Sequence, residues 1–301
     1  MPFNIFNAPV DALHDDLFVQ NKLSVSVLRL DKIHPVVSGN KLFKLHYFLA
    51  EAVQSAHKKI ITFGGAYSNH LVATAFACQE YGIKSIGIVR GEKPGQLSHT
   101  LQQCLEYGME LEFISRIAYA GKEDVDFINT IADSYGDATI IPEGGYHPYG
   151  ANGAALIWDV IGKNNYTHVC TATGTATTLA GLLQGAGSQQ IIGVPVLKGM
   201  HDIDERLNFL LGNAVNKELL QIFNNYHFGG YAKKTPELIG FMNYLWQQHQ
   251  LPADFVYTAK LFFAVYDNIK NGYFAEGSHI LCLHTGGLQG NNSLAPGTLL
   301  F

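Results

Sequence analysis

Short apolar runs of strand length alternate along the chain with longer segments whose apolar positions recur at helical spacing. Between Lys41 and Ser55 the apolar side chains fall at i, i+3, i+4, i+7 and i+8, which predicts a helix with one buried face. The continuous apolar runs at 59–64 and 85–89 are typical of buried strands, and Gly82 is a plausible helix end between them. The chain therefore begins with strand–helix–strand units.

The same alternation continues almost to the C-terminus. Further strands are expected at 111–114, 168–173, 191–196 and 280–284, and further helices at 71–81, 97–107, 177–183, 203–211, 236–250 and 259–270. Nearly continuous apolar strands joined by helices indicate a mostly parallel sheet with helices on both faces. Because there are too many units for one core, we predict an α/β protein with two open, twisted, mostly parallel sheet domains.

Composition and charge exclude several classes of protein. Of the 301 residues, 47% are hydrophobic and only 15% are charged, so the chain is not disordered. A net charge of -5 argues against a nucleic-acid partner, which would need a basic face, and no apolar run is long enough to span a membrane. The N-terminal residues lack the pattern of a secretory signal, and the four cysteines form no CxxC pair. We predict a cytoplasmic protein with reduced thiols and, since no HExxH-like spacing occurs, without a metal site.

The 31 glycines exceed ordinary usage and are not evenly spread. Several cluster where strands are expected to lead into helices, at 64–65, 144–145, 174, 229–230 and 286–287. In open α/β sheets ligands bind beyond the carboxyl ends of the strands, and glycine lets the backbone approach a ligand closely. We interpret these clusters as the lining of one shared crevice.

Two segments at the expected crevice carry candidate chemistry. Lys41 follows a glycine turn, with Lys44 three residues later on the same helix face. A nearby second cation and burial both favour a neutral Lys41 amine, the form that reacts with an aldehyde cofactor. Ser68 and Asn69 stand where a strand leads into a helix, so Ser68 is suited either to cap that helix or to face the crevice.

A third segment, Thr171–Thr178, is rich in small hydroxyl residues and leads from a strand into a helix. A helix N-terminus of this kind offers N–H groups, hydroxyls and a favourable dipole to a phosphate. The segment matches neither GxxxxGK[ST] nor GxGxxG, so a nucleoside triphosphate or dinucleotide is not indicated. The isolated phosphate of a vitamin cofactor fits better.

Six motifs in order, spanning about residues 37–290, resemble the pyridoxal-phosphate enzymes of the tryptophan-synthase-β fold. More narrowly, they resemble the 1-aminocyclopropane-1-carboxylate (ACC) deaminase/D-cysteine desulfhydrase family. The motifs are Ser38-Gly-Asn-Lys-Leu-Phe-Lys44, Gly64-Gly-Ala-Tyr-Ser-Asn69, Thr173-Gly-Thr-Ala-Thr-Thr178, Gly230-Tyr231 with Thr235-Pro236, Asp254-Phe-Val-Tyr-Thr-Ala-Lys260 and His284-Thr-Gly-Gly287.

The resemblance implies a domain division, a cofactor and an assembly. A small α/β domain of residues 44–152 would be inserted in a large cofactor-binding domain of residues 1–43 and 153–301. Pyridoxal 5′-phosphate would be held covalently by Lys41, with Lys44 as the second lysine nearby. The protein would act on a small amino acid and form a homodimer.

The same resemblance assigns the remaining site residues. Ser68 would bind the substrate carboxylate or assist proton transfer, and Asn69 would contact the phenolic oxygen of the cofactor ring. Tyr257 would lie beside the ring and Tyr231 on the substrate side, which makes Lys41, Ser68, Tyr231 and Tyr257 the expected catalytic residues. The phosphate would be cradled by Gly174, Thr175, Ala176, Thr177 and Thr178.

Two departures from the family pattern are informative. The phosphate loop, usually Gly-Ser-Gly-Gly-Thr, lacks two glycines here, which predicts a different loop shape. In ACC deaminases an acidic residue follows the tyrosine and pairs with the pyridine nitrogen, whereas here Thr258 stands at that position. A hydroxyl, from Thr258 or from Thr285, holds that nitrogen less firmly in its cationic form.

The weaker electron sink favours β-elimination over opening of a cyclopropane ring. The expected reaction is therefore that of a D-cysteine desulfhydrase, which gives pyruvate, ammonia and sulfide. One alternative is ACC deamination to 2-oxobutanoate and ammonia. The other is a non-catalytic protein that only binds pyridoxal phosphate. The stereochemical preference is left open by the sequence.

Overall fold

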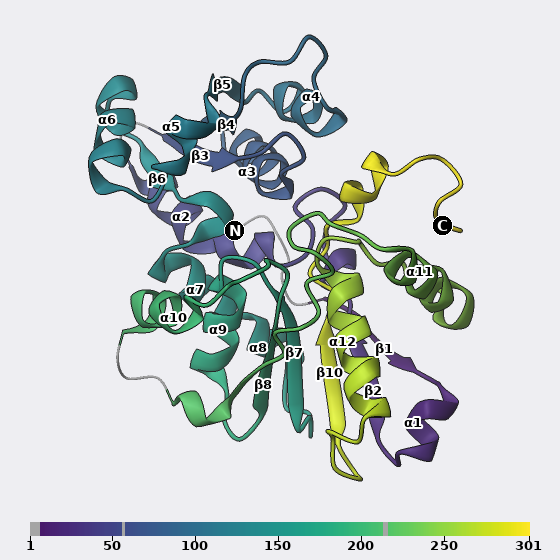
Figure 1. Ribbon diagram of the computed structural model, residues 1–301. Helices are drawn as coiled ribbons and strands as arrows, with labels where there is room; N and C mark the ends of the chain where they lie inside the picture. Colours follow the sequence, from purple (N-terminus) through teal and green to yellow (C-terminus); the bar gives the residue numbers. More distant parts are fainter. Residues whose placement is uncertain (1–6, 56–57, 213–215) are drawn as a thin grey trace.

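The computed structural model describes residues 7–55, 58–212 and 216–301, and strands in this part of the chain form two sheets (Figure 1). The larger sheet contains β1 (Val10–Leu13), β2 (Ser24–Leu28), β7 (His168–Thr173), β8 (Gln190–Pro195), β9 (Leu220–Ile222) and β10 (His279–Leu283). The smaller sheet contains β3 (Lys59–Gly64), β4 (Lys84–Arg90), β5 (Glu110–Ile114) and β6 (Thr139–Ile141).

The two sheets have the strand orders β1-β2-β10-β7-β8-β9 and β5-β4-β3-β6. Every neighbouring pair is parallel except β1 and β2, which form an antiparallel edge. The mostly parallel α/β fold expected from the sequence is thereby confirmed. The sequence pattern missed the short strands β1, β2, β6 and β9, whose side chains are less continuously apolar than those of the central strands.

Helices cover both faces of the six-stranded sheet. One face carries α7 (Pro148–Ala155), α8 (Ile157–Ile161), α9 (Thr177–Gly185) and α10 (Ile203–Leu211), and the other carries α1 (Asp16–Gln20), α11 (Pro236–His249) and α12 (Thr258–Lys270). Since successive strand residues point to opposite faces, Val169 and Leu281 pack on the α9 side, whereas Cys170 and Cys282 pack on the α12 side. Both faces are apolar, which explains the continuous apolar runs.

The four-stranded sheet is built in the same way. Helices α3 (Asn69–Glu80) and α4 (His99–Glu106) cover one face, and α5 (Arg116–Ala120) and α6 (Val125–Tyr135) cover the other. Leu71 and Leu101 bury the first face, and Phe63 and Ile131 bury the second. The two faces of the smaller sheet thus have core clusters of their own, and Ile60 and Ile141 of this sheet also join the core that α7 and α9 share with the larger sheet.

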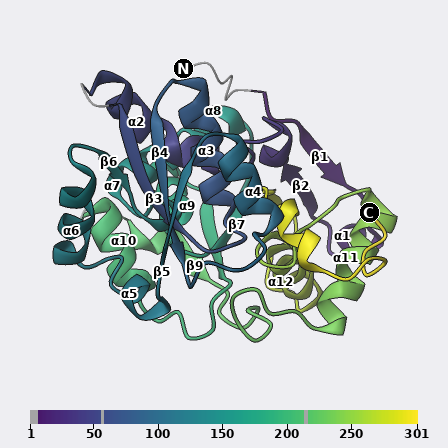
Figure 2. The same ribbon diagram turned by 90° about the horizontal axis from the view of Figure 1, so that it is seen from above.

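Helix α2 (Lys41–Gln54) lies with α7 and α9 between the two sheets, and the view from above shows the smaller sheet over this layer (Figures 1 and 2). The helices approach closely because glycines face their neighbours: a Cβ atom on Gly153 would lie 2.1 Å from the carbonyl oxygen of Phe43, and one on Gly181 would lie 2.5 Å from the backbone nitrogen of Ala155. Some of the many glycines thus serve helix packing and not the crevice. The domain limits at 44 and 152 fall inside α2 and α7, and the division stays a prediction.

The structure also bears on the classes that composition excluded. None of the helices in the described ranges is both long and apolar enough to cross a membrane. The same residues bring together no three His, Cys, Asp or Glu side chains in an arrangement that could hold a metal ion. The four cysteines are buried and free, as expected.

Candidate active site

Lys41 reaches the carboxyl edge of the large sheet because the turn before it is pressed against the loop after β10. Gly39 has a φ of +68°, and a Cβ atom there would lie 2.0 Å from the carbonyl oxygen of Thr285. That oxygen accepts a hydrogen bond from the backbone N–H of Asn40, at 3.4 Å. Only glycine fits at position 39, and the turn starts α2 at Lys41.

The two lysines of this segment lie in different surroundings. The Lys41 ammonium donates to Oδ1 of Asn40 at 2.8 Å, and Nζ of Lys44 donates to the carbonyl oxygen of Gly144 at 3.1 Å. Burial lowers the pKa of Lys41 to about 8, and the negative charge of Asp254 opposes that shift. Burial and the charge of Lys41 hold the pKa of Lys44 well below its usual range. The repulsion that we expected to act on Lys41 thus falls on Lys44, and burial alone drives Lys41 toward the neutral amine.

Ser68 and Asn69 stand where β3 leads into α3, as expected. The Ser68 hydroxyl accepts from the backbone N–H of Leu71 at 3.3 Å, so it caps the helix. Oδ1 of Asn69 is buried without a hydrogen-bond partner. Its amide nitrogen faces the glycine loop after β10, since a Cβ atom on Gly287 would lie 3.2 Å from it. A buried, unsatisfied acceptor at this edge fits a ligand hydroxyl.

The loop between β7 and α9 forms an open helix start. Among residues 7–55, 58–212 and 216–301 no side chain caps α9, so its first backbone N–H groups have no side-chain acceptor there. Ala176 adopts the left-handed conformation, with a φ of 64°, which costs a non-glycine residue about 1–2 kcal/mol. Ala176 thus holds a backbone conformation that glycine ordinarily adopts. The hydroxyl of Thr178 accepts from the Asn40 amide at 2.8 Å, and those of Thr175 and Thr177 are 2.9 Å apart.

The side chains of Tyr257 and Tyr231 lie close to each other. Tyr257 packs over the phosphate loop, because a Cβ atom on Gly174 would lie 3.3 Å from its ring. The two hydroxyls are 3.5 Å apart, and the rings meet edge to face with centroids 6.1 Å apart. Burial and the neighbouring Tyr231 raise the pKa of Tyr257 well above its usual range, and burial raises that of Tyr231. Both phenols are therefore neutral hydrogen-bond donors near pH 7.

A buried carboxylate that the sequence reasoning passed over organises the start of α12. Asp254 is fully buried and accepts from the backbone N–H groups of Val256, Tyr257 and Thr258 and from the hydroxyl of Thr258. The Thr258 hydroxyl in turn accepts from the N–H of Asp254 at 2.8 Å. An Asp four residues before the first residue of a helix was the available signal.

This network distinguishes the two threonines that the sequence left open. Thr258 is fully buried, and its hydroxyl is occupied in both directions by Asp254. Thr285 is 8% exposed, and within the described ranges its hydroxyl has no hydrogen-bond partner. Thr285 is therefore the threonine whose hydroxyl is available to a ligand.

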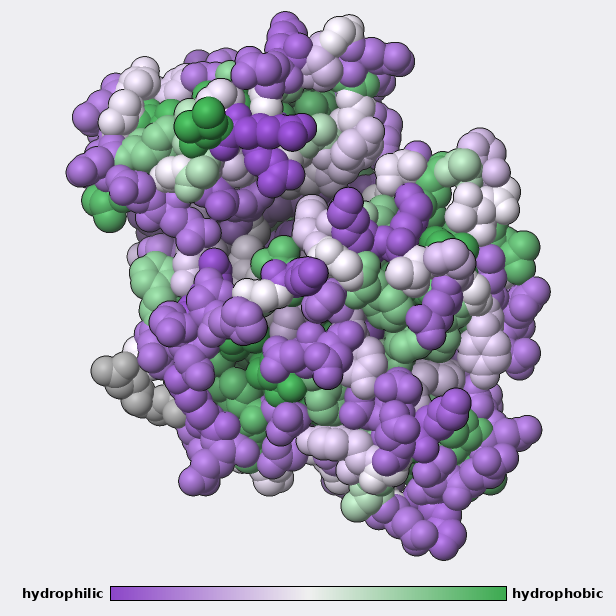
Figure 3. Space-filling model, in the orientation of Figure 1, coloured by the Kyte–Doolittle hydropathy of each residue, from purple (hydrophilic) through white to green (hydrophobic). Residues whose placement is uncertain are grey.

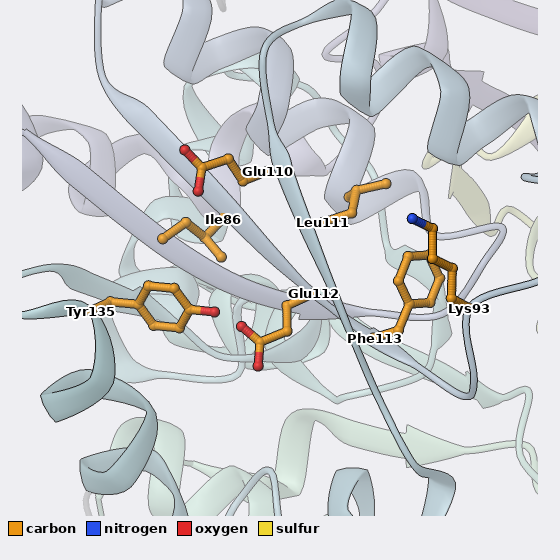
Figure 4. A pocket seen from close by; sticks show the side chains of 7 residues that line it. All are labelled: Ile86, Lys93, Glu110, Leu111, Glu112, Phe113 and Tyr135. Atoms are coloured by element: carbon orange, nitrogen blue, oxygen red, sulfur yellow. The ribbon is translucent and has the colours of Figure 1, made fainter.

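These residues gather where the two sheets face each other, and Figure 3 shows a furrow between the part built on the smaller sheet and the rest of the molecule. The pocket of Figure 4, about 460 Å³, lies elsewhere, on the edge strand β5. It is lined by Ile86, Lys93, Glu110, Leu111, Glu112, Phe113 and Tyr135, none of which was expected in the site.

The geometry is that of an α/β protein whose site suits a phosphate-bearing aldehyde cofactor. A buried lysine amine, an uncapped helix start and an unsatisfied Asn69 acceptor meet at the carboxyl edge of a parallel sheet. The profile of the family described as pyridoxal-phosphate dependent enzymes matches residues 17–286. The chain belongs to this family, and it is a pyridoxal-phosphate-dependent enzyme, which confirms the expected cofactor.

Relatives and solved structures agree with this assignment. A putative ACC deaminase of Thermotoga maritima is 28% identical over 287 residues, covering 89% of each chain. The bifunctional D-cysteine desulfhydrase/ACC deaminase of Arabidopsis thaliana is 28% identical over 280 residues, covering 84% of this chain and 70% of that protein. A crystal structure of an ACC deaminase homologue superimposes with a TM-score of 0.80 at 24% identity, over 96% of this chain and 92% of the other.

Proposed function

We propose that this enzyme catalyses β-elimination from D-cysteine and releases pyruvate, ammonia and sulfide. The observation that carries the proposal is the threonine network at the start of α12. Thr258 replaces the acidic residue of ACC deaminases and is occupied by Asp254, which leaves the uncharged hydroxyl of Thr285 for the pyridine nitrogen. A hydroxyl does not enforce protonation of that nitrogen, which suits a reaction with a leaving group. The name of the Arabidopsis relative includes this activity.

The residues that would hold the cofactor fit its three functional groups. Lys41 would bond to the aldehyde, and the uncapped start of α9 would bind the phosphate through backbone N–H groups. Oδ1 of Asn69, buried and unpartnered, would accept from the ring hydroxyl. Tyr257 would lie beside the ring. Bound pyridoxal phosphate supplies an electron sink that stabilises negative charge on the substrate Cα.

Lys41 is the better candidate for the base that removes the Cα proton. The pKa of its amine is lowered to about 8, whereas the raised pKa values of Tyr231 and Tyr257 keep the phenols protonated. The tyrosines would instead donate hydrogen bonds to the departing sulfur. Ser68 and the start of α3 would hold the substrate carboxylate.

The overall chemistry balances with one molecule of water. The Cα–H and Cβ–S bonds of D-cysteine break, the sulfur leaves as hydrogen sulfide, and water replaces the amine to give pyruvate and ammonia. ACC has no leaving group, and its ring must open by cleavage of a carbon–carbon bond. That step needs the stronger electron sink that a carboxylate beside the pyridine nitrogen provides.

A substrate panel tests the proposal. The purified holoenzyme is incubated with D-cysteine, L-cysteine, D-serine and ACC, and pyruvate and 2-oxobutanoate are measured separately. We expect pyruvate from D-cysteine and little 2-oxobutanoate from ACC, with Lys41→Ala as the inactive control. Turnover of ACC at a comparable rate would favour the second candidate, ACC deamination, which the name of the Thermotoga relative supports. Retained cofactor with no turnover would favour a binding protein.

We also propose a homodimer. The exposed ring of Phe209 on α10 lines a pocket of about 640 Å³ together with Pro148 and Asn152 of α7, and an exposed apolar group at such a hollow is typical of interfaces. Light scattering during size-exclusion chromatography measures the mass directly. A mass of one chain at micromolar concentration would contradict the proposal.

A further inference from the structure

Lys260, in the first turn of α12, is a buried cation without an anionic partner. Its side chain is fully buried, and its ammonium donates to the carbonyl oxygens of Gly230 at 2.8 Å, His227 at 2.9 Å and Val196 at 3.4 Å. Across the described residues no carboxylate oxygen lies within 4.0 Å of it. Asp254 is the acidic residue that acts on it, and the oxygens of Asp254 are occupied by the start of α12.

A lysine in this position needs a specific reason. Burial of an ammonium group is costly unless every N–H finds an acceptor. Burial lowers the pKa of Lys260 to about 8, so near pH 7 the group still carries three N–H donors, one for each carbonyl oxygen. An apolar side chain would fill the space without that cost, but it could not bind the carbonyl groups.

The carbonyl groups belong to a loop that has an unusual backbone. Phe228, Gly229, Gly230 and Ala232 all have positive φ, of 51°, 93°, 121° and 53°. Positive φ strains residues other than glycine, so Phe228 and Ala232 hold a conformation that the surrounding structure must stabilise. Within the loop, the N–H of Gly230 donates to His227 at 3.0 Å. Two of the three oxygens that bind Lys260 come from this loop, so a lysine that lies outside the loop stabilises the conformation of the loop.

The loop that Lys260 binds carries Tyr231. Lys260 itself is the third residue of α12, and Tyr257 directly precedes the first residue of this helix. The hydroxyls of the two tyrosines are 3.5 Å apart. The ammonium therefore connects the two elements that bring the tyrosines together.

We propose that Lys260 is a positioning residue: its ammonium fixes the 227–231 loop, and the loop places Tyr231 against Tyr257 on the substrate side of the site. The part that concerns turnover rests on the proposed function. The part that concerns the loop does not, and the two are measured separately.

The first measurement is limited trypsin digestion of the holoenzyme, with fragments identified by mass spectrometry. Lys233 and Lys234 are exposed and are separated from Tyr231 by Ala232 alone, so cleavage there reports on the loop. In Lys260→Met, which keeps the length of the stem, we expect cleavage at these sites to rise about tenfold relative to cleavage at exposed Lys163. Lys270→Met, a change of an exposed lysine at the end of the same helix, should leave the ratio unchanged. An unchanged ratio in Lys260→Met would overturn the proposal.

The second measurement is a double-mutant cycle with Tyr231→Phe, read as kcat/KM for D-cysteine. If Lys260 acts through Tyr231, Lys260→Met should lower kcat/KM about tenfold or more in the original background and far less in the Tyr231→Phe background. Equal losses in both backgrounds would show that Lys260 does not act through Tyr231. If D-cysteine is not a substrate at all, the proposed function fails, and the digestion still decides whether Lys260 anchors the loop.

A folding control completes the test. Lys260→Gln retains N–H donors on a shorter side chain and should give an intermediate cleavage ratio. If both Lys260 variants fail to fold, the lysine serves the core of the large domain and not one loop, which would contradict the positioning role.

Discussion

Two helices that start at the carboxyl edge of the large sheet differ in how their first N–H groups are satisfied. At α12 the buried carboxylate of Asp254 accepts from three backbone N–H groups and one hydroxyl. At α9 no side chain caps the helix, and Ala176 holds a left-handed turn in front of it. One helix start contains its own anion, and the other lacks one.

The difference suits the proposed site, in which one sheet edge would hold both ends of the cofactor. A helix start attracts an anion, and it attracts a second one poorly once a carboxylate is in place. In the proposed site, the start of α12 would face the cofactor ring with the uncharged side chains of tyrosine and threonine. The start of α9 would bind the phosphate through its N–H groups.

The largest effect is expected when the covalent link is removed but the helix starts are left intact. Lys41→Ala should lower turnover by about 10³-fold or more, because it removes both the cofactor bond and the candidate base. The variant should still bind pyridoxal phosphate through the start of α9, and the absorbance of the bound cofactor should differ from that in the original enzyme. Lys44→Ala, on the same helix, should lose less activity. Complete loss of cofactor affinity in Lys41→Ala would contradict a phosphate site at α9.

Placing an anion at the start of α9 should make it resemble α12. Ala176→Asp is expected to weaken binding of pyridoxal phosphate by about tenfold to a hundredfold, because like charges repel at this distance. Asn also tolerates the left-handed conformation, so Ala176→Asn is the matched control and should bind near the original affinity. Titration of the apoenzyme measures both. Equal weakening would show that the loop backbone, and not charge, limits binding.

Removing the anion at the start of α12 should destabilise the fold. Asp254→Asn weakens several buried hydrogen bonds and removes a charge, and the free energy of unfolding should fall by about 1–3 kcal/mol. Denaturant unfolding measures the change, with Asp159→Asn, an exposed residue in the first turn of α8, as control. An unchanged stability would mean that the N–H groups do not depend on the carboxylate.

The same carboxylate should tune the reactivity of Lys41. Only the neutral amine attacks an aldehyde, so the rate of cofactor loading onto the apoenzyme should rise with pH through a midpoint near 8. The charge of Asp254 raises the pKa of Lys41, so Asp254→Asn should move that midpoint to lower pH. Stopped-flow absorbance follows the loading. A midpoint that moves to higher pH would contradict the contribution of Asp254.

The smallest effect is expected from relief of the turn before α9. Ala176→Gly should stabilise the protein by about 0.5–1 kcal/mol, because the strain of a positive φ exceeds the entropy that glycine adds to the unfolded chain. In contrast, Ala180→Gly inside α9 should destabilise it by about 1 kcal/mol or more. Thermal unfolding of both variants provides the comparison, and a destabilised Ala176→Gly would mean that the turn is not strained.

Much of the fold followed from local patterns. Strands β3 and β7 and helix α10 have the limits that apolar periodicity predicted, because both their periods and their ends are encoded within a few residues. Helix α7, Pro148–Ala155, was not predicted, since its sequence contains two glycines and has low helix propensity. It forms because Gly150 and Gly153 let it pack against its neighbours.

The candidate site likewise has a part that the sequence predicted and a part that it did not. The positions of Ser68, Asn69 and the 173–178 loop at strand ends were predicted from the sequence, because strand–turn–helix order places them there. Lys41 was predicted after a glycine turn at the start of a helix. The choice between Thr258 and Thr285 was not, since it depends on which hydroxyl Asp254 occupies. The roles assigned to the site residues stay predictions until the variants are measured.

The sequence by itself determined the type of fold, the cofactor and the place of the lysine, since hydrophobic period and short ordered motifs are local properties of the chain. Only the tertiary structure decided that burial lowers the pKa of Lys41, that Asp254 closes one helix start while the other stays open, and that Lys260 anchors the loop of Tyr231. The physical reason is distance along the chain: Lys260 meets carbonyl groups 30, 33 and 64 residues away. No periodicity reports a contact made only when separate loops fold onto one sheet edge.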